Sequence, residues 1–244
     1  MSQMKKTLEF FVQTKDVDFN DRIKPTAILD IFQDAAGLHA RELGVGYEDL
    51  KQKNYAWVVL YQKFEILKSL PYLDTVLIHT WPKPKSRLEF TREYLITDKK
   101  EEPLVKGISN WVVIDLSTRG LVRTDSIEFN GEYVSFTNYP DKCKRKLGLD
   151  AQRIEEYFEY EVSLDDIDHN GHMNNSRYLN ILQNYLFTYG SKSYMKDVEI
   201  AYVKEVKYKE HIRIGHFKFE EKEAFIGYCN NEICFESLIG VERI

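Results

Sequence analysis

Apolar residues recur at helical spacing in two stretches of the chain. The first stretch opens with Pro25, and proline is well tolerated in the first turn of a helix because its missing N–H would have no partner there. The apolar positions that follow are Ile28, Ile31, Phe32, Ala35 and Ala36. After Asn174 the apolar positions are Tyr178, Ile181, Leu182, Tyr185, Leu186 and Tyr189. These spacings predict two amphipathic helices, and the broad stripe of the second predicts burial over most of its circumference.

Each predicted helix is followed by segments with the composition of β-strands. They are rich in β-branched and aromatic residues and end at Pro, Gly or polar turn signals. They span 56–66, 75–81, 88–97 and 105–115 in the first half, and 198–207, 211–219, 224–229 and 233–241 in the second. Short polar connections predict antiparallel pairing. The pattern therefore predicts an α+β fold in which an antiparallel sheet wraps one long helix, twice over.

The two halves share a short internal repeat. A shift of 150 positions aligns 16–33 with 166–183, and six of the eighteen aligned residues are identical, where background usage predicts about one. The identical pairs are Asp16/Asp166, Asp18/Asp168, Asn20/Asn170, Leu29/Leu179, Ile31/Ile181 and Gln33/Gln183. We expect two tandem units at 1–135 and 153–244, joined by a connector at 136–152 that lacks periodicity.

The composition is typical of a folded protein and argues against several functional classes. The chain has 244 residues, of which 43% are apolar and 30% charged. No stretch approaches the roughly 18 apolar residues of a membrane span. The net charge of −5 argues against broad nucleic-acid binding, which depends on many Lys and Arg side chains. No apolar secretory segment follows the first residues, so a cytoplasmic location is expected.

The cysteines and the isolated histidines form no recognisable site. Cys143, Cys229 and Cys234 make an odd number without a Cys-x-x-Cys spacing, so neither disulfides nor zinc are expected. The last two flank a predicted hairpin turn and are expected to be small buried hydrophobes, whereas the first is expected to be exposed. The histidines without a partner pattern, expected to be structural, are His39, His79, His211 and His216.

The run 168–175 concentrates polar side chains directly ahead of the second helix. It consists of Asp-His-Asn-Gly-His-Met-Asn-Asn. A helix start needs one small acceptor, such as Asn174 or Asn175, because one side chain satisfies one of its free N–H groups. Asp168, Asn170 and His172 exceed that need. The excess predicts a reaction centre in addition to a helix cap.

This run resembles the Asp-x-Asn-x-His-x-Asn-Asn signature of the acyl-acyl carrier protein thioesterases, in their bacterial form. The segment 202–206 is similar to the strand on which that family places a glutamate near the motif, here Glu205. The resemblance covers nearly the whole chain. It implies a double hotdog fold and hydrolysis of a fatty acyl thioester held on acyl carrier protein. Plant members have a cysteine where this chain has Val206, which cannot attack, so water addition without an acyl-enzyme is implied.

Thioester hydrolysis needs a positioned water, a base, and donors aimed at the oxygen that becomes negative. The leaving thiol has a pKa of about 8.5, so a strong general acid is dispensable. We expect Glu205 or Asp168 to be the base, with Glu205 preferred by its reach. Asn170 and His172 would orient the water or bond the thioester carbonyl. No cofactor and no metal are expected.

Substrate binding is expected at the start of the second helix and in the first half of the chain. Backbone N–H groups at Asn174 and Asn175 would bind the oxyanion, helped by the helix dipole. The first half would house the acyl chain, because each buried methylene gains about 0.8 kcal/mol. Trp57 is our candidate for a residue that lines the acyl pocket. Trp81 and Trp111 lie in the same half of the chain, although aromatic strand residues are often plain core.

Several of these residues also have an ordinary structural interpretation. Asp168 and Asn170 recur as Asp18 and Asn20, so turn and cap chemistry can account for them. The histidine of the motif differs, because its counterpart Arg22 has no neutral-imidazole chemistry. This difference predicts a single active site per chain.

Glu205 and the motif histidines have alternatives of their own. Glu205 could be a solvated edge charge paired with Lys204 or Lys207. A metal site is the weaker alternative, because no further ligand cluster is apparent. Its candidate ligands would be His169, His172 and Asp168.

The expected partner is acyl carrier protein, which is acidic and would dock on a basic surface. Candidate clusters are Lys142, Lys144, Arg145 and Lys146, and Lys83, Lys85 and Arg87, although such runs are more often solvated loops. The same chemistry on coenzyme A is the nearest rival function. A non-catalytic acyl-binding hotdog is a rival from another class. Both a monomer and a homodimer agree with the fold.

Overall fold

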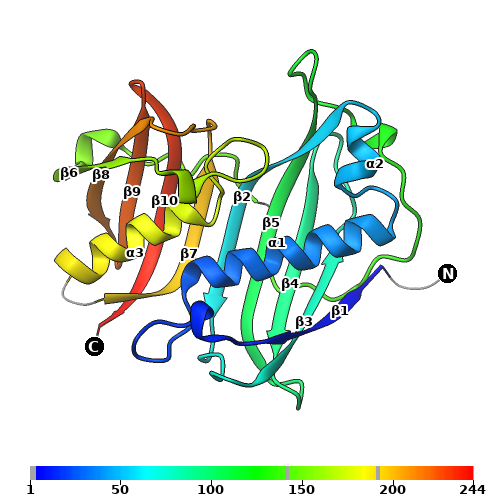
Figure 1. The fold of residues 1–244 in the computed structure, drawn as a ribbon, viewed down its shortest axis with the longest axis horizontal. Helices are drawn as coiled ribbons and strands as arrows, with labels where there is room; N and C mark the ends of the chain where they lie inside the picture. The colour runs from blue at the N-terminus through cyan, green and yellow to red at the C-terminus, as the bar shows by residue number, and fades with distance from the viewer. Residues whose placement is uncertain (1–3, 141–142, 191–192, 244) are drawn as a thin grey trace. The chain divides into compact units, whose positions relative to one another are not determined.

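The computed structural model describes residues 4–140, 143–190 and 193–243. The chain divides into two compact units, Met1–Cys143 and Lys144–Ile244, and the division falls inside the connector expected at 136–152. Within the described residues each unit has one long helix and five antiparallel strands (Figure 1). The two units are described in turn.

The first unit places its long helix α1 across a sheet. The helices are α1 Pro25–Glu42 and α2 Tyr47–Lys51, with single 3₁₀ turns η1 Thr14–Asp16 and η2 Thr124–Ser126. The strands are β1 Lys6–Phe11, β2 Tyr55–Ile66, β3 Thr75–Pro82, β4 Phe90–Thr97 and β5 Pro103–Asp115. They pair antiparallel in the order β1-β3-β4-β5-β2. Helix α1 contacts β1 and β3.

The second unit repeats this plan. Its helix is α3 Arg177–Tyr189, with 3₁₀ turns η3 Ala151–Arg153 and η4 Leu164–Asp166. The strands are β6 Glu156–Glu161, β7 Ser193–Tyr202, β8 His211–Phe219, β9 Lys222–Cys229 and β10 Glu232–Arg243. They pair antiparallel in the order β6-β8-β9-β10-β7. Helix α3 contacts β7.

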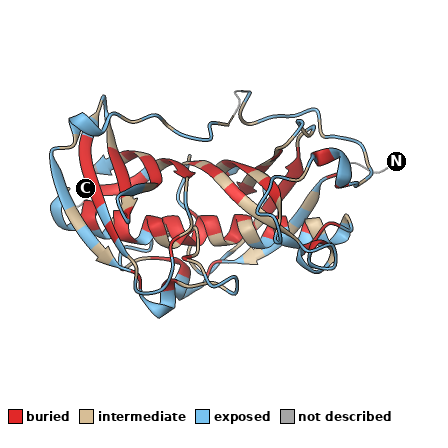
Figure 2. Ribbon diagram, turned by 90° about the horizontal axis from the view of Figure 1, so that it is seen from above, coloured by how far each residue is buried: buried red, intermediate tan, exposed pale blue. Residues whose placement is uncertain are grey.

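The two predicted helices and the α+β architecture are confirmed. The apolar stripes of α1 and α3 are buried while the loops are exposed (Figure 2). In α1, Phe32 is 1% exposed and stacks on Tyr94 of β4, with ring centroids 4.2 Å apart. Stripes at helical spacing thus form the contact between helix and sheet in both units.

Some boundaries differ from the predictions. The strand expected at 198–207 runs from Ser193 to Tyr202, so its predicted end was wrong. The second helix begins at Arg177, after a turn, and not directly after Asn174. Helix α2 was not predicted, because five residues are too few to show a period.

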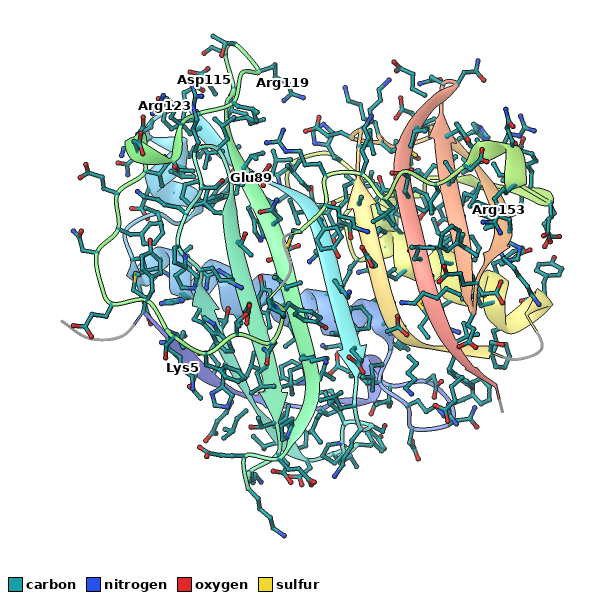
Figure 3. All side chains as sticks on the ribbon, turned by 180° about the vertical axis from the view of Figure 1, so that it is seen from behind. Lys5, Glu89, Asp115, Arg119, Arg123 and Arg153 are labelled. Carbon is teal, nitrogen blue, oxygen red and sulfur yellow. The ribbon has the colours of Figure 1, made fainter. Side chains whose placement is uncertain are left out.

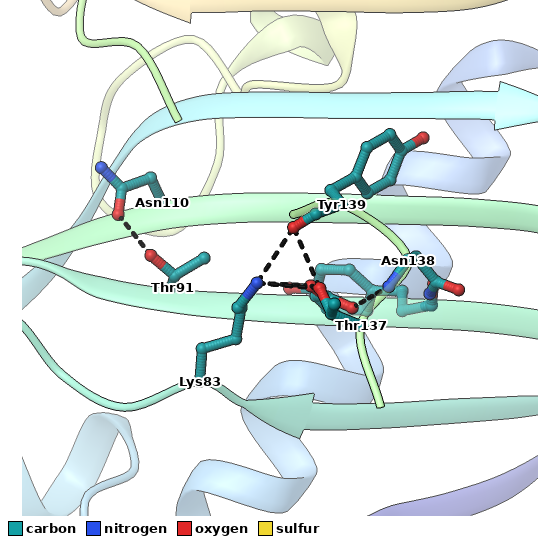
Figure 4. Close-up of polar contacts among 8 residues, drawn as sticks. Lys83, Thr91, Asn110, Thr137, Asn138 and Tyr139 are labelled. Carbon is teal, nitrogen blue, oxygen red and sulfur yellow. Dashed lines mark hydrogen bonds and ion pairs between the residues drawn. The ribbon is translucent and has the colours of Figure 1, made fainter. Parts of the chain in front are cut away.

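Buried glutamates hold both ends of the connector. Glu93 of β4 accepts the N–H of Asn138 at 2.6 Å and lies 3.0 Å from the Lys83 ammonium (Figure 4). In the second unit, Glu236 of β10 accepts the N–H groups of residues 147–149 at 2.8–3.3 Å. A carboxylate bonded in this way satisfies backbone donors that loops otherwise leave to water. Each end of the connector is therefore tied to the sheet of its own unit.

The beginning of the second unit is fastened by Arg153, labelled in Figure 3. Its guanidinium lies 5.3 Å from the ring centre of Phe217 and 5.1 Å from that of Phe219, both in β8. It also donates to the carbonyl of Lys218 at 2.8 Å. Cation–π contacts of this kind hold the turn η3 against the strand.

Candidate active site

The polar segment ahead of each helix folds into the same closed turn. In the first unit the N–H of Asp18 donates to the carbonyl of Arg22 at 2.8 Å. In the second unit the N–H of Asp168 donates to the carbonyl of His172 at 2.9 Å. The β-bridges that close the two turns are Val17 with Ile23 and Ile167 with Met173. The internal repeat at a shift of 150 positions is therefore confirmed down to individual hydrogen bonds.

Asp168 holds this turn with its side chain. Its Oδ1 accepts the N–H of Asn170 at 2.8 Å, as Oδ1 of Asp18 accepts the N–H of Asn20 at 2.8 Å. Gly171 continues the turn at a φ of 78°, a conformation that favours glycine. The turn role of Asp168 is thus confirmed. A catalytic role for Asp168, or for the exposed Asn170, stays a prediction.

Glu205 lies in the loop after β7, so its expected place within a strand was wrong. The regular ladder stops because the N–H groups of Val203 and Lys204 both donate to the carbonyl of Cys234, at 2.8 and 3.2 Å. Consecutive N–H groups in a regular strand point in opposite directions, so this shared acceptor breaks the extended geometry. The chain leaves the sheet at this point and turns toward the motif.

A backbone hydrogen bond closes this loop onto the motif. The N–H of Met173 donates to the carbonyl of Val206 at 2.8 Å. Each partner is the sequence neighbour of a candidate catalytic residue, so the bond brings His172 and Glu205 together. Nε2 of His172 lies 3.2 Å from Oε2 of Glu205, and their side chains are 25% and 35% exposed. Water can therefore reach the pair while the backbone holds it in place.

The contact between His172 and Glu205 suits proton transfer. Nε2 of His172 lies within ion-pair distance of Oε2 of Glu205, where an imidazole nitrogen can accept or release a proton. A carboxylate and an imidazole in one partly exposed site can take a proton from water and stabilise the charge that develops. The following residue, Val206, is buried and brings no reactive group.

The first unit has the same backbone arrangement with different side chains. The N–H groups of Leu67 and Lys68 both donate to the carbonyl of Leu104, at 2.8 and 3.1 Å, as their counterparts do in the second unit. By this correspondence Ser69 stands in the place of the glutamate. Arg22 stands in the place of the histidine. The carboxylate–imidazole combination therefore belongs to the second unit alone among the described residues.

The neighbouring lysine does not account for Glu205. Lys204 forms its salt bridge with Glu232, and its counterpart Lys68 forms the equivalent one with Glu102. This ion pair recurs in the unit that lacks the glutamate. It is therefore a feature of the repeated loop and independent of Glu205.

The two asparagines at the end of the motif act differently. Oδ1 of Asn174 accepts the N–H of Ser176 at 2.9 Å and its hydroxyl at 3.0 Å. This bonding caps the turn that precedes α3. The carbonyl of Asn175 accepts the buried hydroxyl of Tyr202 at 2.9 Å. The predicted role of Asn174 and Asn175 in binding substrate stays a prediction.

Trp57 belongs to a cluster in the first unit. Its indole N–H donates to the carbonyl of Val45 at 2.9 Å, and its ring meets Phe90 edge-on with centroids 4.9 Å apart. The cluster also contains Leu50 and Val113. Trp57 is thus part of an apolar core next to α1 and α2, and its contact with an acyl chain stays a prediction.

One of the two basic clusters proposed for docking is largely engaged within the fold. The Lys83 ammonium bonds to Glu93 and donates to the carbonyl of Tyr139, each at 3.0 Å (Figure 4). The Lys85 ammonium donates to the carbonyls of Thr124 and Ile127, both at 3.1 Å. Of the other cluster, Lys142 lies outside the described residues.

The cysteines are not poised as nucleophiles. Cys229 and Cys234 are buried, as predicted, whereas Cys143 is half-buried where full exposure was expected. Burial raises the pKa of Cys229, and burial together with Cys229 raises the pKa of Cys234 to about 12. Both are therefore neutral thiols near pH 7, and the thiolate is the reactive form.

Among the described residues, no three His, Cys, Asp or Glu side chains are arranged so that they could hold a metal ion together. No helix in this part of the chain has the length and apolar character needed to cross a bilayer.

A partly buried ionic cluster contacts α3, and it was not foreseen from the sequence. His216 of β8 contacts Glu156 of β6 at 3.0 Å through Nδ1 and Glu223 of β9 at 2.8 Å through Nε2. The Tyr185 hydroxyl of α3 lies 3.1 Å from Nδ1 and also donates to Glu156. Burial disfavours the charged imidazole, but the bonds to Glu223 and Glu156 outweigh burial and raise the pKa of His216. The cluster joins the helix to three strands.

We expect this cluster to make the stability of the protein dependent on pH. A histidine whose pKa is raised by folding stabilises the fold below its unfolded pKa of about 6.5, and the contribution is lost as the pH rises through the folded value. The His216→Gln variant should therefore lose about 2 kcal/mol in free energy of unfolding at pH 6, and less at pH 9. Urea unfolding at both pH values measures the difference. His211→Gln, at an exposed position of the same strand, should change stability by less than about 0.5 kcal/mol at either pH. A loss in His216→Gln that is equal at both pH values would contradict the assignment.

The family model of the acyl-ACP thioesterase N-terminal domain matches residues 3–128, and that of the C-terminal domain matches residues 150–237. The chain belongs to the acyl-ACP thioesterase family. The family was predicted from the motif at 168–175, and that prediction is confirmed.

Individual members of the family are distant in sequence. The chloroplast palmitoyl-acyl carrier protein thioesterase of Gossypium hirsutum is 23% identical over 193 residues, which cover 70% of this chain and 44% of the relative. This family member thus spans less than half the length of the curated plant relatives it matches.

Solved structures show the fold. An acyl-ACP thioesterase from Bacteroides thetaiotaomicron has a TM-score of 0.81 at 23% identity, covering 98% of both chains. The 12:0-ACP thioesterase from Umbellularia californica has a TM-score of 0.79 at 17% identity, covering 98% of this chain and 97% of that one. The double hotdog fold expected for this thioesterase-family chain is therefore confirmed.

Proposed function

We propose that this chain hydrolyses fatty acyl thioesters of acyl carrier protein and releases free fatty acids for lipid metabolism. The observation that carries the proposal is the 3.2 Å contact between Nε2 of His172 and Oε2 of Glu205 in a family member. The pair is accessible to water and follows a turn that presents polar groups at the start of α3. A cytoplasmic location and a homodimer stay predictions.

In the proposed reaction Glu205 is the general base. Its carboxylate takes a proton from a water molecule, whose oxygen adds to the thioester carbonyl. His172, which lies 3.2 Å from Glu205, aligns the carboxylate and stabilises the charge that forms. The C–S bond then breaks, the electron pair leaves with sulfur, and the thiolate takes up the proton. Since a thiol has a pKa of about 8.5, no stronger acid is required.

The oxyanion needs donors that are already in place when the water adds. The polar turn and the residues just before α3 offer the backbone N–H of Asn175 and the carboxamide of Asn170. Removal of one such donor typically lowers kcat by about 10²-fold or more. We assign these groups to the carbonyl oxygen of the thioester, and a role of Trp57 in holding the acyl chain stays a prediction.

Direct attack by water is favoured over an acyl-enzyme. Val206 follows the glutamate and has no nucleophilic atom. Cys229 and Cys234 are buried thiols whose pKa values are raised. A carboxylate base acting on water is the chemistry that the accessible side chains support.

The test compares one acyl chain on two carriers. The purified chain should release free fatty acid from acyl carrier protein thioesters, with a higher kcat/KM than from the coenzyme A thioester of the same acid. Acyl chains of several lengths should be included, because the pocket depth is not set by the catalytic pair. A clear preference for the coenzyme A thioester would mean that coenzyme A, and not acyl carrier protein, is the carrier. Tight binding without release of acid would identify a non-catalytic acyl-binding protein.

A further inference from the structure

Asp166 lies beneath the catalytic motif and carries several structural bonds at once. It is 5% exposed, and its Oδ2 accepts the N–H of Ser163 at 2.8 Å, the Ser163 hydroxyl at 2.7 Å and the Tyr160 hydroxyl at 2.7 Å. Its backbone carbonyl accepts the N–H of Asn174 at 2.8 Å. One residue therefore connects strand β6, the turn η4 and the far end of the motif.

These bonds enclose the segment that carries His172. The motif leaves Asp166 and returns to its carbonyl at Asn174, so both ends of the loop meet at one residue. The next bond along the chain, from Met173 to the carbonyl of Val206, sets the loop against the segment of Glu205. The distance between the imidazole and the carboxylate thus depends on two neighbouring backbone hydrogen bonds, one from Asn174 to Asp166 and one from Met173 to Val206. The carbonyl of Asp166 accepts the first of these hydrogen bonds.

We infer that Asp166 is a positioning residue for the catalytic pair, a role that rests on the proposed function. Its carboxylate does not touch the proposed reacting atoms. It fixes Asp166 to Ser163 and Tyr160, and the backbone carbonyl of the fixed residue closes the loop at Asn174, so that His172 stays within reach of Glu205. An ionised carboxylate is suited to this because it accepts several hydrogen bonds on its oxygens and donates none.

Tyr160 also helps to hold Asp166 in place, through the hydrogen bond that its hydroxyl donates to the carboxylate. Burial and the bonded Asp166 carboxylate raise the pKa of Tyr160. The phenol therefore keeps its proton and remains a donor to Asp166 at neutral pH. Since Tyr160 lies in β6, the loop is held to the edge of the sheet of its own unit.

The first unit supplies a matched control at Asp16. Asp16 is also 5% exposed, its Oδ2 accepts the N–H of Gln13 at 2.9 Å, and its carbonyl accepts the N–H of Lys24 at 2.8 Å. Its Oδ1 pairs with the Lys15 ammonium at 2.8 Å, where Asp166 instead accepts two hydroxyl groups. The loop that it closes carries Arg22 where the second unit carries the histidine. The same substitution at the two aspartates should therefore loosen two equivalent loops, of which one bears the catalytic pair.

The experiment compares Asp166→Asn with Asp16→Asn in the full chain. In Asp166→Asn we expect kcat for fatty acid release to fall by about 10²-fold with KM changed less than about 3-fold, because displacement of catalytic groups by about 1 Å has this effect. Asp16→Asn should keep kcat within about 2-fold of the unmodified protein. Melting temperatures of the two variants should fall by similar amounts.

Amide hydrogen exchange provides a second readout that does not need activity. Exchange at Met173 and Asn174 should accelerate about 10-fold or more in Asp166→Asn, and exchange at Lys24 should accelerate in Asp16→Asn. If Asp166→Asn does not fold, Tyr160→Phe removes a single bond, and a loss of about 10-fold in kcat is expected from it.

The outcomes separate this inference from the proposed function. Equal kcat in the two aspartate variants, in a protein that does hydrolyse thioesters, would overturn the inference and leave the proposed function standing. If the unmodified protein shows no hydrolysis, the proposed function fails, and unchanged exchange at Met173 in Asp166→Asn would overturn the positioning of the loop as well. Full activity of Tyr160→Phe, where that variant has to be used, would also overturn it.

Discussion

Replacement of His172 by Ala or of Glu205 by Gln is expected to lower thioester hydrolysis by about 10²-fold or more while the protein remains folded. Both side chains are partly exposed and neither is a core residue, so their loss should affect chemistry more than stability. The measurement is kcat/KM for fatty acid release, with circular dichroism to verify folding. Since the two groups are proposed to act together, the double variant should be about as active as the slower single variant.

The first unit, which is predicted to be catalytically silent, provides the controls for this prediction. Arg22→Ala and Ser69→Ala change the positions that correspond to the histidine and the glutamate. Both variants should retain full hydrolysis, because no carboxylate–imidazole pair exists at that turn. A loss in Arg22→Ala comparable with that in His172→Ala would contradict a single active site. Full activity in both His172→Ala and Glu205→Gln would show that neither residue takes part in catalysis.

The largest effect on stability is expected at Gly107 of β5. A Cβ built at this position would lie 2.1 Å from Cε2 of Phe32, a residue of α1 that is 1% exposed. Phe32 cannot move aside easily because it is stacked on Tyr94. Gly107→Val should therefore lower the free energy of unfolding by about 3 kcal/mol, the upper end of the usual effect of overpacking. Urea unfolding measures the change.

Gly37 is the matched control in the same unit. It is an exposed position of α1, and a Cβ there would have no atom within 4 Å. Gly37→Ala should raise the free energy of unfolding by about 0.5–1 kcal/mol, because alanine has the higher helix propensity. A Gly107→Val protein as stable as the unmodified one would mean that Phe32 of α1 does not lie against Gly107 of β5.

Local sequence patterns predicted most of the architecture. The stripes from Ile28 to Ala36 and from Tyr178 to Tyr189 identified both long helices because burial on one side imposes a period. The end of β7 was misplaced because the β-branched residues Val203 and Val206 continue past Tyr202, whereas the strand is ended by hydrogen bonds to Cys234, a residue distant in sequence. Such non-local contacts leave no mark in a short window of sequence.

The repeat between the units extends further than the sequence revealed. Over the helices it has a shift of 150 positions, but Leu67 corresponds to Val203, a shift of 136, and Leu104 corresponds to Cys234, a shift of 130. Loops of different length break a single alignment. The first-unit positions that correspond to the proposed catalytic pair are therefore identified from backbone hydrogen bonds, because a single sequence shift does not align both of them.

The candidate site was only partly predictable from the residues. The excess of polar groups at 168–175 indicated chemistry, but the choice of Glu205 depended on the family resemblance. The contact of Glu205 with His172 arises from the bond between Met173 and Val206, which no spacing predicts. The cluster at His216 was missed for a similar reason, because its partners come from one helix and two other strands.

The most direct test of the central claim follows thiol and fatty acid together during the first turnovers of an acyl carrier protein thioester. Attack by water assisted by Glu205 and His172 predicts that both products appear in equal amounts from the start, and that both are slowed alike in Glu205→Gln. A burst of free thiol ahead of the acid would reveal an acyl-enzyme and would contradict the account.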